Sequence, residues 1–248
     1  MSSPDWFSQL RSGRPIFAVF TRLPRKGQVK TRLAPLVGVN GAVRFHRAFL
    51  RDTLDRVARC ARRCGADVAL AYAGGGLPDG ELRRWANGAL LIPQAGGDLG
   101  DRLREFHRQL FAGGSGPVIV VGSDSPTLPE AHLEMALREL QTHAAVLDPA
   151  ADGGYVLLGV SRPLPALLEA IPWGTDEVFA ATCQRANRAG TRLAILPGWY
   201  DVDDPDGLAR LRATLTVQGS STAPETARVL AALDPPVPRR PGPGGKRS

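Results

Sequence analysis

This chain of 248 residues has few cysteines and no long apolar run. Both features limit the classes of protein to which it can belong. Three cysteines occur, with Cys60 and Cys64 four positions apart and Cys183 remote, and there is no CxxC pair. Neither a zinc site nor a disulfide framework is therefore indicated. No apolar run approaches the ~18 residues of a membrane helix, and the first residues lack the apolar core of a signal peptide. We expect a soluble cytoplasmic protein without a membrane partner.

Several well-known active-site motifs are also missing. The sequence has no GxxxxGK[ST] motif, no GxGxxG after a strand and no GxSxG. These absences argue against a P-loop, a dinucleotide-binding Rossmann site and a serine-hydrolase nucleophile. Histidine is present only in predicted helices, with no acid or nucleophile placed to complete a triad, so we interpret all four as surface or core residues. They are His46, His107, His132 and His143.

Positive charge is present but unevenly placed. The net charge is +7, and residues 234–248 hold four basic residues against one acid in a tail rich in proline and glycine. We expect this tail to be disordered. Five further cations lie in one short loop, so the rest of the chain is about neutral. It lacks the broad basic face that nucleic-acid binding uses, and no nucleic-acid partner is expected.

That loop, within AVFTRLPRKGQVKTRLAPL at residues 18–36, is the most informative feature of the sequence. It contains no acid, and its cations are Arg22, Arg25, Lys26, Lys30 and Arg32. Such a cluster is typical of a site that binds nucleotide phosphates, and Gly27 lets the backbone approach a ligand. The alternative is a solvated basic turn.

Apolar periodicity predicts strands that alternate with helices. We expect strands over 15–21, 67–73, 89–94, 117–122, 144–148, 155–160 and 191–196, and helices over 41–63, 77–86, 99–112, 130–142, 176–189 and from Asp204 to about 218. Thr127 and Glu130 have capping-box spacing, and PVIVVG at 117–122 should be the central strand. The pattern indicates a mostly parallel sheet with helices on both faces, where ligands bind beyond the carboxyl ends of the strands.

We expect this domain to span residues 15–218. Residues 1–14 would be an N-terminal extension, and residues 219–248 a short helix followed by the disordered tail. Nothing in the sequence decides whether the chain dimerises, although a homodimer is compatible with it.

Two acidic loops follow predicted strands. GSDSP at 122–126 places Asp124 beside small residues, including Ser123, as a natural ligand for a hard metal. WYDVDDP at 199–205 gathers three acids, which is costly unless a cation lies between them. We expect Asp203 to share Mg²⁺ or Mn²⁺ with Asp124, Asp201 to orient that ligand set or join it, and Asp204 to cap a helix. A turn or capping role is the alternative for Asp124.

Two further loops carry weaker signals. In PAADGGY at 149–155, Gly153 and Gly154 beside Asp152 would allow close contact with a substrate, although a tight hairpin explains them equally well. Asp152 and Asp201 are both candidates for a catalytic base.

In QAGGDLGDR at 94–102, the Gln94 side chain and backbone amides could recognise the edge of a base. This segment would bind the nucleotide through Gln94, Gly96, Asp98 and Arg102.

Six ordered segments carry a resemblance: FTRLPRKGQVKTRLAP, QAGGDLGDRL, VGSDSPTLP, DGGYVLLG, the Trp173-Gly174-Thr175 turn and WYDVDDPDGL. Together they resemble the radical-SAM/selenodomain-associated transferase type 1 family, some of whose members are labelled arsenosugar-biosynthesis glycosyltransferases. That family is similar to the GT-A nucleotide-diphospho-sugar transferases, and its KTRL loop resembles that of 2-phospho-L-lactate guanylyltransferases. The resemblance implies a GT-A-like sheet and a divalent metal, with Asp124 and Asp203 as its acids and Lys30 and Arg32 as phosphate-binding cations.

Three functions follow as hypotheses. The first is metal-dependent glycosyl transfer from a nucleotide sugar to a small-molecule acceptor. The second is nucleotidyl transfer with release of pyrophosphate. In both, Lys30, Arg32 and Asp124 would act on the phosphates. The third is a binding protein that engages a nucleotide, RNA or an acidic partner without turnover.

Overall fold

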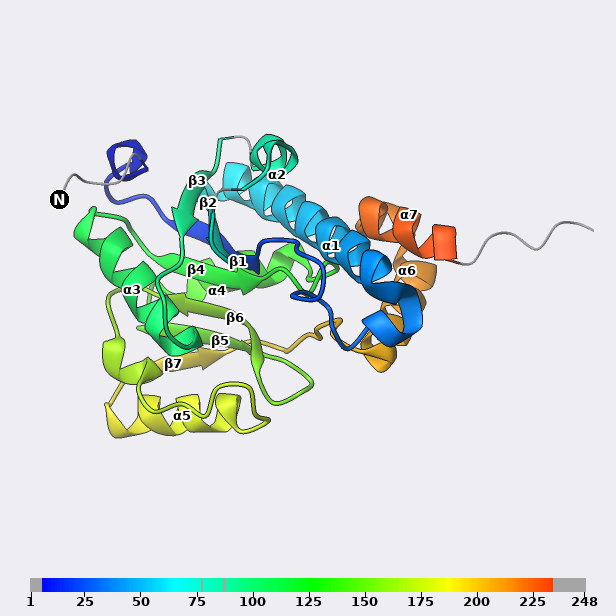
Figure 1. Cartoon of the computed structure of the whole chain (residues 1–248). Helices are drawn as coiled ribbons and strands as arrows, with labels where there is room; N and C mark the ends of the chain where they lie inside the picture. The colour runs from blue at the N-terminus through cyan, green and yellow to red at the C-terminus, as the bar shows by residue number, and fades with distance from the viewer. Residues whose placement is uncertain (1–5, 77, 87, 234–248) are drawn as a thin grey trace, which may run out of the picture.

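A seven-stranded sheet forms the centre of the computed structural model, which describes residues 6–76, 78–86 and 88–233 (Figure 1). Its strand order is β3-β2-β1-β4-β6-β5-β7. The strands are β1 (Ile16–Arg22), β2 (Asp67–Ala73), β3 (Leu90–Pro93), β4 (Val118–Gly122), β5 (Ala145–Pro149), β6 (Tyr155–Val160) and β7 (Leu193–Ile195). The tail expected to be disordered lies outside the described residues.

The helices are α1 (Ala34–Cys64), α2 (Gly80–Trp85), α3 (Leu99–Ala112), α4 (Glu130–Glu139), α5 (Val178–Arg188), α6 (Pro205–Gln218) and α7 (Pro224–Leu233). Three short 3-10 helices are η1 (Phe7–Gln9), η2 (Pro165–Leu168) and η3 (Ser220–Thr222). Among the described residues, none of these helices is both long and apolar enough to span a bilayer.

The sheet is mostly parallel, as predicted, and β4 is its middle strand. β4 is paired on both sides, with β1 and with β6, and its residues 118–121 are all buried. This position explains why PVIVVG is a continuous apolar run. Within the described sheet β6 alone runs antiparallel, because it returns from β5 in a hairpin and inserts between β5 and β4. The hairpin interpretation of the DGG segment is therefore confirmed.

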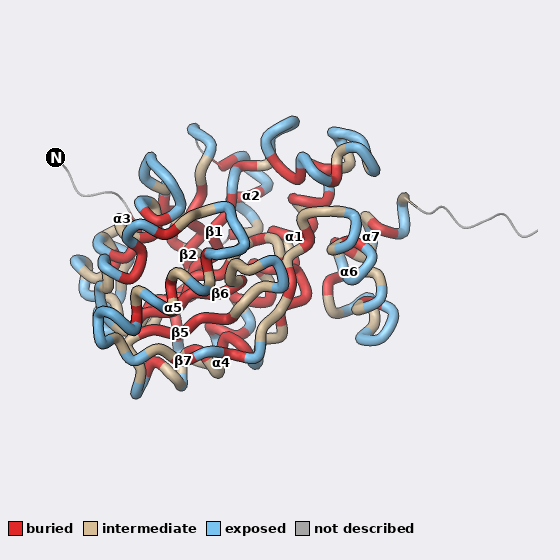
Figure 2. Tube along the Cα trace, turned by 90° about the horizontal axis from the view of Figure 1, so that it is seen from below, coloured by how far each residue is buried: buried red, intermediate tan, exposed pale blue. Residues whose placement is uncertain are grey.

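Helices cover both faces of the sheet, and the buried strands lie between them (Figure 2). On one face, α1, α2 and α4 pack through Leu54, Leu82 and Leu133. On the other face, α3 and α5 pack through Phe106 and Ala186. A third cluster joins the N-terminal half of α1 to α6 and α7, so the last helix extends the core.

Two helix starts differ from the sequence-based expectation. The helix α1 begins at Ala34 rather than near 41, but it breaks at Gly38, whose φ of 72° lies outside helical geometry. The capping box predicted for α4 is wrong: its N-cap is Pro129, and the Thr127 hydroxyl instead bonds Tyr200 Oη at 2.9 Å. The cap predicted for α6 is confirmed, since Asp204 accepts from Gly207 N.

Candidate functional site

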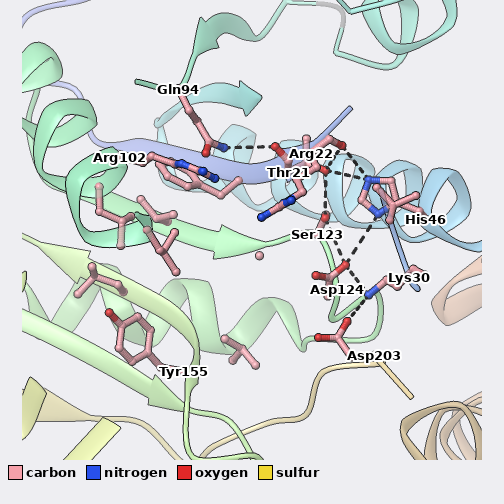
Figure 3. Close-up of a pocket in the computed structure, with 18 of the residues that line it drawn as sticks. Thr21, Arg22, Lys30, His46, Gln94, Arg102, Ser123, Asp124, Tyr155 and Asp203 are labelled. Carbon is pink, nitrogen blue, oxygen red and sulfur yellow. Dashed lines mark hydrogen bonds and ion pairs between the residues drawn. The ribbon is translucent and has the colours of Figure 1, made fainter. Parts of the chain in front are cut away.

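A pocket of about 530 Å³ opens where β1 and β4 end, at the edge of the sheet expected for a ligand (Figure 3). Its walls come from the segment after β1, the start of α3, the turn after β4, strand β6 and the segment before α6. One part is ionic and contains Asp124, Asp203 and several cations. The other part is apolar, with Phe20, Val120 and Leu158 among its residues.

Asp124 and Asp203, which we call the acidic pair, meet in this pocket from distant parts of the chain. Asp124 lies two residues beyond β4, and its backbone carbonyl accepts from Val202 N at 2.9 Å. That bond fixes residues 198–204, which we call the acidic loop, against the end of β4. The two carboxyl side chains are 37% and 47% exposed, so both are open to a ligand.

Lys30 lies between the two acids. Its Nζ is 2.5 Å from Asp124 Oδ1 and 2.7 Å from Asp203 Oδ1, and it donates to the Val202 carbonyl at 2.9 Å. Burial would lower the pKa of Lys30, but the two carboxylates outweigh it and raise that pKa above its ordinary value. Burial in turn would raise the pKa of Asp124, whereas the charge of Lys30 and its hydrogen bond lower that pKa overall. Both groups are therefore charged at neutral pH.

His46 supports the same cluster from α1. Its Nε2 lies 2.8 Å from the Arg22 carbonyl, which can only accept, so this nitrogen carries the proton. Nδ1 faces Asp124 Oδ1 at 4.0 Å. Burial lowers the pKa of His46, with the Asp124 charge opposing that shift. The imidazole is neutral near pH 7 and fixes the end of β1 beside Asp124.

Hydroxyl groups complete the connection between β1 and β4. Thr21 Oγ1 donates to Ser123 Oγ at 3.1 Å, and Ser123 Oγ lies 3.5 Å from Asp124 Oδ1. Ser123 was expected to contribute to the site and lines the pocket. Thr21 and His46 were not expected there. Their contacts connect the end of β1 to the turn after β4 and to α1. The spacing of Thr21 and His46 in the sequence does not indicate these contacts.

Asp201 is placed differently from the acidic pair. It accepts from Ser125 Oγ and is not among the described residues that line the pocket. Burial, followed by the nearby charges of Asp124 and Asp203, raises the pKa of Asp201 to about 7. Its predicted place in the metal site, or as a base, stays a prediction.

The remaining cations of the loop after β1 take different positions. Arg22 and Arg32 are exposed and line the pocket, as a phosphate-binding role requires. Arg25 donates to the Gly75 carbonyl, whereas Lys26 and Gly27 are exposed and lie outside the described lining. The predicted contacts of Lys26 and Gly27 with a nucleotide remain predictions.

Three of the four residues predicted to bind the nucleotide around the start of α3 line the pocket, namely Gln94 and Asp98 before the helix and Arg102 within it. Gln94 Nε2 donates to the Ala71 and Thr21 carbonyls at 2.8 and 3.3 Å, which leaves its amide oxygen as the free acceptor. Asp98 caps α3, and Arg102 Nε donates to the Gly97 carbonyl at 3.1 Å. Gly96 is exposed and lies outside the described lining.

The DGG hairpin lies outside the described lining as well. Asp152 accepts from Gly154 N at 3.0 Å, which closes its own turn. Gly153 has φ of 86°, and a Cβ there would lie 2.1 Å from the Asp176 carbonyl oxygen, so only glycine fits. Gly153 therefore allows close packing against the segment before α5. The predicted substrate contacts of Gly153 and Gly154 and a catalytic role for Asp152 stay predictions.

The acidic pair fits a divalent cation that is shared with a substrate. Among the described residues, no three His, Cys, Asp or Glu side chains form a metal-binding group. Mg²⁺, however, is often held by one or two carboxylates together with substrate phosphates and water. The contacts with Lys30 use Oδ1 of both acids, and Figure 3 shows the second oxygen of each turned toward the open pocket.

Comparisons with known proteins agree with this architecture. Residues 53–175 match a family described as an uncharacterized protein conserved in bacteria, DUF2064. The solved structure of a Desulfovibrio desulfuricans G20 protein, provisionally named a nucleotide-diphospho-sugar transferase, is 30% identical with a TM-score of 0.80. The match covers 90% of this chain and 96% of that one.

Two more distant structures share the fold. A CMP:2-keto-3-deoxy-manno-octonic acid synthetase complexed with CTP is 13% identical with a TM-score of 0.53, covering 83% of this chain and all of that one. A 4-diphosphocytidyl-2C-methyl-D-erythritol synthase from Anaerococcus prevotii DSM 20548 is 13% identical with a TM-score of 0.54, covering 82% and 99%. No curated protein sequence matches the chain.

Proposed function

The chain is a transferase of the nucleotide-diphospho-sugar transferase superfamily, and on this premise we propose that it transfers a glycosyl group from a nucleotide sugar to a small-molecule acceptor, with Mg²⁺ or Mn²⁺. The observation that carries the proposal is one pocket in which exposed Arg22 and Arg32 accompany the acidic pair. A nucleoside diphosphate needs both kinds of group, namely cations for its oxygens and carboxylates for its metal.

In this mechanism the chain's own residues position the diphosphate and stabilise its charge. Arg22 and Arg32 would bind phosphate oxygens as the bond to the sugar breaks, because guanidinium groups match phosphate geometry. Asp124 and Asp203 would hold the metal, which supplies further positive charge beside the leaving group. Gln94 would accept a hydrogen bond from a donor group on the base.

Nucleotidyl transfer is the second candidate, and the cation density around the pocket favours it. Arg22, Arg32 and Arg102 all line the pocket beside Lys30. Release of pyrophosphate places more negative charge there than release of a nucleoside diphosphate. The CTP-bound synthetase of the same fold is named for a cytidylyl product, although at 13% identity it shares only the fold.

The released product distinguishes these reactions. Nucleotides and nucleotide sugars are first screened with Mg²⁺ or Mn²⁺ for a rise in melting temperature, since a specific ligand stabilises the folded protein. The ligands that stabilise it are then incubated with candidate acceptors. Nucleoside diphosphate from a sugar donor supports glycosyl transfer, and pyrophosphate from a triphosphate supports nucleotidyl transfer.

Asp124→Asn tests the site itself. We expect turnover to fall about 10²- to 10³-fold, because the metal and the developing charge lose a carboxylate partner. Asp206→Asn is the matched control, since Asp206 is exposed in the first turn of α6 and should leave turnover unchanged. Unchanged metal-dependent turnover in Asp124→Asn would contradict the proposal.

A further inference from the structure

The acidic pair is already occupied by a cation that belongs to the protein. We propose that Lys30 and a divalent metal compete for Asp124 and Asp203, so that the metal binds well only after nucleotide phosphates have taken the lysine as their partner. This inference rests on the proposed function in one respect, namely that the acidic pair holds the metal.

The contacts of Lys30 leave its ammonium group saturated. An ammonium can donate three hydrogen bonds, and Lys30 Nζ has three oxygen partners: both carboxylates, at 2.5 and 2.7 Å, and the Val202 carbonyl at 2.9 Å. Its side chain is 2% exposed, and Nζ lies 5.2 Å from the centre of the Phe49 ring. Without a nucleotide, Lys30 is thus held by the cluster, in contrast to the exposed Arg22 and Arg32.

This arrangement disfavours a metal in the absence of a nucleotide. Two carboxylates and one ammonium leave a charge of only −1 for a divalent ion to meet. A divalent cation held by these acids would be repelled by the Lys30 ammonium, and this repulsion is strong because Lys30 is shielded from water. Each acid also gives its Oδ1 to the lysine.

A nucleotide changes this balance because it brings its own negative oxygens. Lys30 lines the pocket, so its ammonium can exchange carboxylate partners for phosphate oxygens there. Its backbone φ of 48° is unusual for a residue other than glycine, and such conformations persist where surrounding contacts hold them. After the exchange, phosphate oxygens would balance the charge of Lys30, and both carboxylates would be available to the metal. Nucleotide and metal then raise each other's affinity by the same factor.

Binding of Mn²⁺ alone tests the competition without any turnover. Free Mn²⁺ is titrated by electron paramagnetic resonance against the wild-type protein, Lys30→Met and Arg84→Met. We expect Lys30→Met to bind Mn²⁺ about tenfold more tightly than wild type, within the usual range of coupling between sites. Arg84→Met, which removes an exposed cation of α2 outside the pocket lining, should match wild type. Equal Mn²⁺ affinity in wild type and Lys30→Met would overturn the proposal.

Two further variants keep the test decisive. If Lys30→Met does not fold, Lys30→Gln replaces it in the same titration, since its amide can still donate to the Val202 carbonyl. The double variant Lys30→Met with Asp124→Asn should lose the gain, and a gain that persists there would place the metal elsewhere and contradict the proposal.

The transfer assay separates this inference from the proposed function. Metal-dependent turnover together with equal Mn²⁺ affinity in wild type and Lys30→Met means that the function holds and the competition is wrong. Tighter Mn²⁺ binding by Lys30→Met, with no nucleotide turned over, means that the competition holds and the proposed function is wrong.

Discussion

Two side-chain clusters hold the acidic loop against the sheet, and they differ in how far the protein encloses them. At the pocket, Lys30 bonds Asp203 and the Val202 carbonyl, and Asp203 is 47% exposed. Beneath the same loop, His132 Nδ1 lies 2.5 Å from Asp148 Oδ2, with the two side chains 8% and 0% exposed. Asp148 Oδ1 also accepts from Gly198 N at 2.8 Å.

The difference separates a structural pair from a functional one. Both carboxylate oxygens of Asp148 have hydrogen-bond partners within the protein, and the rings of His132 and Trp199 pack in a T-shaped arrangement. A polar group enclosed in this way is costly to leave without a partner. Asp124 and Asp203 each keep an oxygen toward the pocket, so they can exchange partners. Enclosure therefore indicates which acids hold the loop and which can serve a substrate.

Asp148→Ala should produce the largest loss of stability. It leaves the buried His132 imidazole and the partly buried Gly198 amide without their acceptor, which we expect to lower the free energy of unfolding by about 3–5 kcal/mol. Urea unfolding followed by circular dichroism measures the loss. A change below about 1 kcal/mol would mean that the enclosed pair does not hold the loop in the way described.

His107 is a buried histidine that, unlike His132, has no carboxylate partner in the described part of the chain, so it shows what burial alone does to a histidine. Among the described residues its Nε2 has no hydrogen-bond partner, and burial lowers its pKa to about 4. Because the unfolded chain binds this proton near pH 6.5, stability present above that pH is lost as the pH falls toward 4. At about 1.4 kcal/mol per pKa unit, the loss is about 3 kcal/mol.

His107→Leu should remove this part of the pH dependence. Urea unfolding of both proteins between pH 7.5 and 4 gives the difference in unfolding free energy at each pH. We expect the unfolding free energy of the variant to rise relative to that of wild type as the pH falls. A difference that is constant with pH would contradict the lowered pKa of His107.

Asp203→Asn should have the smallest effect on stability. Lys30 keeps Asp124 and the Val202 carbonyl, and the asparagine oxygen can still accept from Nζ. Because Asp203 is half exposed, we expect a loss of about 1 kcal/mol or less in the same urea assay. A loss as large as that of Asp148→Ala would remove the distinction between the two clusters.

The sequence predicts the sheet well because strand and helix periods are local properties. Strands 67–73 and 155–160 and helix 99–112 match the structure residue for residue. The antiparallel insertion of β6 is not visible in this way, since strand order depends on contacts between distant segments. The capping box at Thr127 fails for the same reason, because a bond to distant Tyr200 takes that hydroxyl.

The acids of the candidate site could be predicted from the sequence, but the contacts between its side chains could not. Asp124, Asp203 and Lys30 follow strands or flank helices, so their meeting at one edge of the sheet could be expected from topology. The direct pairing of Lys30 with both acids could not, because it depends on an unusual backbone angle and on burial. His46 was assigned to the core or surface, and it is buried as a core residue yet contacts the end of β1.

The inserted strand β6 also limits how this pocket can vary during evolution. Leu157 and Leu158 line the pocket and are paired in register with Val121 and Val120 of β4. A one-residue slip would turn every β6 side chain to the opposite face, whereas a shift by two would preserve the facing. A shift in the register of β6 can thus remodel the pocket without inverting its faces only in steps of two residues, unless a bulge absorbs the odd one.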